Sequence, residues 1–80
     1  MYYHIQILNY NDGTATKKSL YEFDNENSAV ANFHKYMGSA METDNVASAL
    51  EIVFTNTGAI IESKYYVKPI EVEEPTTDGE

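Results

Sequence analysis

The stretch that decides the fold is "DNENSAVANFHKYMGSAMETDN", residues 24–45, because its apolar side chains recur every three to four residues. This spacing is typical of one side of an α-helix. Either Asp24 or Asn25 is expected to cap the amino end, since both side chains can accept a hydrogen bond from an unpaired backbone amide. We predict a helix that ends near Thr43, with an apolar stripe formed by Ala29, Val30, Phe33, Tyr36, Met37, Ala40 and Met41.

Gly38 lies inside this predicted helix, where a glycine costs about 1 kcal/mol relative to alanine. The glycine could end the helix early, or it could lie on the outer side of a continuous helix. We predict continuation, because Ala40 and Met41 extend the apolar stripe beyond it.

The segments on both sides of the helix have the two-residue alternation of β-strands. Residues 2–10 and 15–24 are joined by "NDGT", and Asp-Gly is a strong hairpin signal. Residues 50–55 and 60–68 are joined by "TNTG", where Gly58 is expected to need a positive φ. The predicted class is therefore α+β: a ββαββ chain that forms a four-stranded antiparallel sheet with one helix packed on one face.

The alternation also predicts which side chains lie under the helix. The expected covered set is Tyr3, Ile5, Ile7, Tyr21, Phe23, Leu50, Ile52 and Phe54. The opposite, open face is then expected to carry Leu8, Tyr10, Leu20, Val53, Ile60 and Tyr66 among polar residues.

The negative charge is concentrated at the carboxyl end of the chain. The 80 residues carry a net charge of −8, and Glu71, Glu73, Glu74, Asp78 and Glu80 contribute five of the negative charges. Residues 1–70 contain eight acidic residues against five lysines. We predict one domain over residues 1–70 and a disordered acidic tail over residues 71–80, because such a polar segment buries too little apolar surface to offset its ordering entropy.

Several function classes are disfavoured by what the sequence lacks. The two histidines, His4 and His34, are thirty residues apart and belong to no catalytic or metal-binding motif, so we expect neither an enzyme nor a cofactor. Five lysines without arginine argue against direct nucleic-acid binding. No apolar run is long enough to span a membrane. The absence of cysteine and of a secretion signal is consistent with a cytoplasmic location.

Protein binding remains the favoured class. Seven tyrosines in 80 residues supply large apolar area with a polar tip, which suits interfaces. The residues expected to contact a partner are Leu8, Tyr10, Leu20, Val53 and Tyr66 on the open face, with His34 on the outer helix side as a second, weaker candidate. A homodimer would explain the same residues, and scattered apolar residues on a sheet can also have no partner.

In overall pattern the chain resembles small accessory proteins of phages and prophages of Gram-positive bacteria. The likeness lies in size, acidity, lack of cysteine, and stretches such as "YEFDNENSAVANFHKYMGSAM" before "ALEIVFTNTGAI". Proteins of that kind include anti-CRISPR inhibitors, which act by binding. The resemblance implies a non-enzymatic module that occludes a host protein, such as a nucleic-acid-processing defence enzyme. The alternatives are a self-associating structural or capsid-accessory subunit and a nucleic-acid mimic that acts through the acidic tail.

Overall fold

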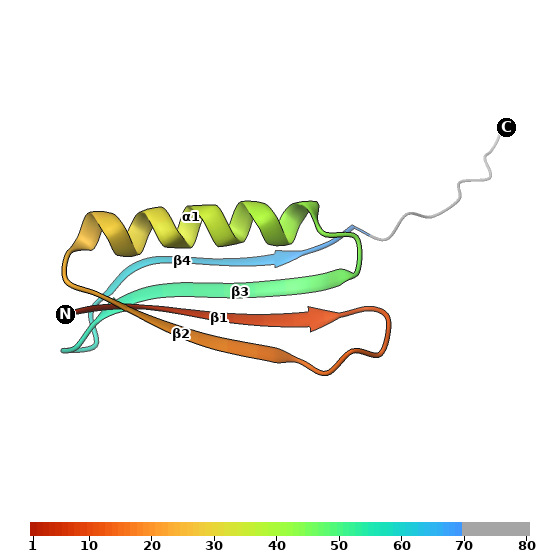
Figure 1. Cartoon of the computed structure of the whole chain (residues 1–80), viewed down its shortest axis with the longest axis horizontal. Coiled ribbons are helices and arrows are strands. Elements are labelled where there is room, and N and C mark those ends of the chain that lie inside the picture. The colour runs from red at the N-terminus through yellow and green to blue at the C-terminus, as the bar shows by residue number, and fades with distance from the viewer. Residues whose placement is uncertain (70–80) are drawn as a thin grey trace, which may run out of the picture.

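The computed structural model describes residues 1–69 and confirms the ββαββ fold (Figure 1). Its elements are β1 (Tyr2–Tyr10), β2 (Lys17–Phe23), α1 (Glu26–Glu42), β3 (Val46–Thr55) and β4 (Ile60–Val67). The strands form one antiparallel sheet in the order β2-β1-β3-β4, so β2 and β4 are its edges. The predicted acidic tail, residues 71–80, lies outside the described residues.

Helix α1 runs along the length of the strands (Figure 1) and begins and ends where its capping residues predict. The side chain of Asn25 accepts a hydrogen bond from the Ser28 amide at 2.8 Å, which selects Asn25 over Asp24 as the N-cap. The helix continues through Gly38 to Glu42, as expected, and Thr43 is its C-cap.

The two hairpin turns contain the glycines that the sequence indicated. Gly13 has φ of 89° and Gly58 has φ of 93°, in the region that glycine tolerates best. The first connection spans residues 11–16, longer than a two-residue turn. Its Asp12 carboxylate accepts hydrogen bonds from Thr14 and from the Asn45 side chain, which lies just before β3. These hydrogen bonds, that of the Thr14 hydroxyl first, lower the pKa of Asp12 to about 2.

The predicted assignment of the sheet faces is wrong for β1 and β3. His4, Gln6, Leu8, Glu51 and Val53 are buried beneath α1, whereas Ile5, Ile7 and Ile52 point to the opposite side. The physical reason is the pairing register. The prediction grouped Tyr21 and Phe23 with Tyr3 and Ile5, but His4 pairs with Tyr21 and Tyr2 with Phe23. A one-residue change in register moves every side chain of a strand to the other face.

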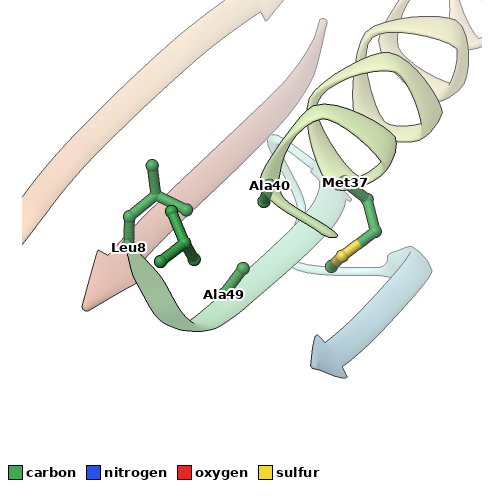
Figure 2. Close-up of a cluster of buried hydrophobic side chains, with 5 residues drawn as sticks. Leu8, Met37, Ala40 and Ala49 are labelled. Atoms are coloured by element: carbon green, nitrogen blue, oxygen red, sulfur yellow. The ribbon is translucent and has the colours of Figure 1, made fainter. Parts of the chain in front are cut away.

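The core between sheet and helix consists of two apolar clusters. The first joins Leu8, Met37, Ala40, Val46 and Ala49, and Figure 2 shows Leu8 and Ala49 on the side of the sheet that faces Met37 and Ala40 of α1. The second joins Ala29, Phe33 and Val53. Alanines on both the helix and β3 have almost no side-chain bulk, so the helix can pack closely on this face.

Candidate functional site

The sheet face opposite α1 is an apolar surface, called here the open face. It comprises Tyr3, Ile5 and Ile7 of β1, Leu20 of β2, Leu50, Ile52 and Phe54 of β3, and Ile60, Tyr65 and Val67 of β4. Among residues 1–69, α1 is the only helix, and it lies on the other side of the sheet. No described element therefore covers the open face.

Side chains at the two edges of the open face are the most exposed. Leu20 on β2 is 57% exposed, and Ile60, Tyr65 and Val67 on β4 are 64%, 62% and 58% exposed. The central strands are half-buried because their side chains cover one another: the rings of Tyr3 and Phe54 stack with centroids 5.4 Å apart. A contiguous surface of this kind marks interaction sites more reliably than scattered apolar residues do.

The covered face has the opposite character at its centre, where four polar side chains form a hydrogen-bonded network. His4 and Glu51 are both 0% exposed. His4 Nε2 lies 2.7 Å from Glu51 Oε1, and His4 Nδ1 lies 2.8 Å from Asn32 Nδ2 of α1, both at hydrogen-bonding distance. Gln6 Nε2 donates to the other Glu51 oxygen at 2.9 Å. The network thus joins β1, β3 and α1.

Aromatic rings extend this network towards the β2 edge. The ring of Tyr21 stacks on His4 with centroids 5.5 Å apart and on Tyr36 of α1 with centroids 5.3 Å apart. Because both His4 and Glu51 lack exposed surface, a substrate cannot reach them. The arrangement positions the helix on the sheet.

Two hollows flank the helix. A cavity of about 270 Å³ between α1 and the β1–β2 side is lined by Gln6, Leu8, Tyr10, Lys17, Tyr21, Tyr36, Ser39, Ala40, Thr43 and Val46. A wider groove of about 430 Å³ between α1 and β4 is lined by Phe33, His34, Met37, Gly38, Met41, Glu62, Ser63 and Lys64. Their volumes fall below or at the low end of the range of small-molecule sites, roughly 300–1,000 Å³.

The predicted partner-binding residues do not form one surface. Leu8 and Val53 are buried under the helix, so the expectation that they face outward is wrong. Tyr10 and Tyr66 are half-buried and pack against the first core cluster, also on the helix side. Leu20 lies on the open face, as expected. His34 is exposed beside the groove, with its ring edge against Phe33 at 5.1 Å between centroids.

The residues that sequence reasoning missed are the central ones of the open face, such as Ile5 and Ile52, because they were expected to lie under the helix. The alternation of apolar residues in these strands was recognised. The pairing register between the strands places them on the open face, and it is set by loop lengths that the sequence does not reveal. One feature of the sequence could have indicated the correct faces. His4, Gln6 and Glu51 can form hydrogen bonds with one another, so they can be buried together on one face of the sheet.

Within residues 1–69, the structure groups no set of three or more His, Asp or Glu side chains that could hold a metal ion. The described part of the chain also has no helix long and apolar enough to cross a membrane. Comparisons with family models, curated proteins and solved structures found no significant match for this sequence or fold.

Proposed function

We propose that the chain is a non-enzymatic protein-binding module and that the open face is its binding surface. The observation that carries this proposal is the contiguous apolar area from Leu20 across the central strands to Tyr65. Eight residues per strand and four strands give a face of about 27 Å by about 19 Å, or roughly 500 Å². A patch of that size is at the upper end of what soluble monomers expose, and such patches are often functional.

The charge of the open face supports a protein partner over a nucleic acid. Its only charged neighbours on the same side of β2 are Lys18, opposite Ile7, and Glu22, opposite Tyr3. One cation and one anion give no net attraction for phosphates. A partner with an apolar surface of its own would bury the face and be stabilised by the hydrophobic effect.

The resemblance to phage accessory proteins would make that partner a host protein, for example a nucleic-acid-processing defence enzyme. This identification stays a prediction. The proposal of protein binding does not depend on it, because it rests on the open face alone.

The experiment compares partner capture by the full-length protein and by two face variants, Leu20→Glu and Tyr65→Glu. Both residues are more than half exposed and lie at opposite edges of the face, so the folded state tolerates the change. The prey is a bacterial lysate supplemented with a differently tagged copy of this chain. Ala31→Glu, on the exposed side of α1, is the matched control.

We expect both face variants to lose at least tenfold in retention of the partner, while Ala31→Glu retains it, because a buried carboxylate without a counter-ion is strongly unfavourable. Circular dichroism verifies that each variant is folded. Equal retention by all four proteins, or retention of nothing by the wild type, would overturn the proposal.

A further inference from the structure

We propose that the partner of the open face is a second copy of this chain, packed face to face about a two-fold axis. The axis would run across the strands along the row Leu20, Ile5, Ile52 and Ser63. This inference rests on the proposed function, because it names the occupant of the same surface.

The sheet register defines three rows of side chains that span all four strands on the open face, and a shorter fourth row, Asn9–Ser48–Val67, lies beyond the Lys18 row. The central row is Leu20–Ile5–Ile52–Ser63. On one side of it lies the row Lys18–Ile7–Leu50–Tyr65, and on the other side lies the row Glu22–Tyr3–Phe54–Ile60. The only charged side chains in these rows are Lys18 and Glu22, and they occupy equivalent places on either side of Leu20.

A two-fold axis along the central row exchanges the two outer rows between copies. Lys18 of one copy then faces Glu22 of the other, and the same contact recurs at the symmetry-related position. Ile7 faces Tyr3, Leu50 faces Phe54, and Tyr65 faces Ile60, so apolar side chains meet apolar side chains in the outer rows, and each residue of the central row, Ser63 included, faces its own copy. The face is complementary to itself in both polarity and charge.

The alternative two-fold axis, parallel to the strands, has no such complementarity. It places β2 of one copy over β4 of the other, because it exchanges the two edges of the sheet. Lys18 and Glu22 would then lie against the apolar residues Tyr65 and Ile60, where their charges have no counter-ion. Charge pairing therefore selects the axis across the strands.

The available area is sufficient for a weak, specific dimer. The three rows that the axis superposes measure about 20 Å by about 19 Å, which gives roughly 400 Å² per copy and about 800 Å² in a pair, within the range of weak, transient complexes. Sheets that pack face to face lie about 10 Å apart with strands within about 30° of each other. The product is a four-layer particle, helix–sheet–sheet–helix, with an expected dissociation constant of about 1–100 µM.

The test is sedimentation equilibrium of the full chain from about 1 to 500 µM, a range that brackets this constant. We expect a monomer–dimer equilibrium. Lys18→Glu and Glu22→Lys should each weaken the dimer about tenfold, because each creates two like-charge contacts across the axis. The double variant Lys18→Glu/Glu22→Lys should restore the wild-type constant, since it exchanges the two charges in both copies. Both substituted residues, Lys18 and Glu22, are exposed on an edge strand, and melting curves of dilute protein verify folding of the three variants.

Other outcomes identify other occupants and overturn the inference. A chain that stays monomeric at all concentrations, while Leu20→Glu and Tyr65→Glu still abolish capture of a lysate protein, leaves the proposed function standing and refutes the second copy. A dimer that is indifferent to Leu20→Glu and to the charge exchange uses an edge strand instead. A dimer lost when the acids of residues 71–80 are replaced by their amides uses that segment. Failure of the double variant to recover refutes the stated axis.

Discussion

The two faces of the sheet differ in a way that reverses the usual distribution of polarity. The face under α1 holds His4, Gln6 and Glu51 at its centre, all buried, whereas the face without a covering element holds Ile5 and Ile52. Polar groups are stable in the interior when they are hydrogen-bonded, and His4, both oxygens of Glu51 and the amide nitrogens of Gln6 and Asn32 all have partners in this network.

The comparison shows what decides burial in this protein. Close packing against the helix and hydrogen bonding between polar side chains matter more than the hydropathy of each residue. Small residues such as Ala49 let the helix approach the covered face, and hydrogen bonds compensate the polar ones. Bulky apolar residues such as Ile5 and Ile52 remain on the open face, which no element of residues 1–69 covers. The two faces therefore have separate roles: one stabilises the monomer, and the other is proposed to bind.

The largest effect should come from breaking the buried network. Glu51→Ala leaves His4 and Gln6 without their acceptor, and we expect the free energy of unfolding to fall by about 3 kcal/mol or more. Urea unfolding followed by circular dichroism measures the loss. Glu51→Gln is the matched control, because it keeps the shape and one carbonyl acceptor and should cost clearly less. A loss below about 1 kcal/mol for Glu51→Ala would show that the network is not essential to the covered face.

The second prediction compares neighbours that point to opposite faces. Val53→Thr inserts a hydroxyl into the core at a residue that is 0% exposed, and should cost about 2 kcal/mol. Ile52→Thr makes a similar change on the half-buried open face and should cost less than about 1 kcal/mol in dilute protein. Urea unfolding at low micromolar concentration separates the two. The reverse order would mean that the helix covers the other face.

The sequence was sufficient to predict the element order, because the helical stripe and the alternating strands have clear periods. An N-cap at Asp24 or Asn25 and the passage of the helix through Gly38 followed from local chemistry, namely a side-chain acceptor and a continuing stripe, and the structure selects Asn25. Gly58 followed from its turn in the same way. Such features depend on residues close together in the chain.

Which residues lie on each face of the sheet could not be predicted from residues close together in the chain. Whether Tyr21 lies on the same face as His4 or as Ile5 depends on which residue of β1 pairs with it. The six-residue connection between β1 and β2 sets that pairing. Hydropathy alone placed Ile52 inside and Glu51 outside. The reversed result depends on contacts distant in sequence, such as the bond from His4 to Glu51. The candidate surface was therefore anticipated only at Leu20 and Ile60.

A third prediction concerns a site that belongs to neither face. A Cβ added at Gly38 meets nothing within 4 Å, and the position is helical. Gly38→Ala should therefore stabilise the fold by about 1 kcal/mol, which corresponds to a rise in Tm of about 4–8 °C. Gly13→Ala is the contrasting control, because its φ of 89° strains any other residue, and it should lower Tm. Self-association should be unchanged by Gly38→Ala, and a change would place the outer helix side in the interface.

The smallest effect should come from Asp12, at the end of the sheet where its carboxylate joins the first hairpin connection to Asn45. Because its folded pKa is lowered from 3.8 to about 2, the carboxylate stabilises the folded state above pH 4, and this contribution is lost as the pH falls towards 2. The stability difference between wild type and Asp12→Asn should shrink over that interval.

Carboxyl NMR titration tests the cause of the shift. The Asp12 midpoint should lie near 2 in the wild type and rise towards 3.8 in Thr14→Val, because the Thr14 hydroxyl makes the largest contribution. Asp12 is fully exposed, so added salt should reduce the effect on stability. An unchanged midpoint in Thr14→Val would contradict this account. Because Asp12 lies outside both faces, its titration should alter neither the buried network nor self-association, so any pH dependence of the dimer between 2 and 4 would have to arise elsewhere.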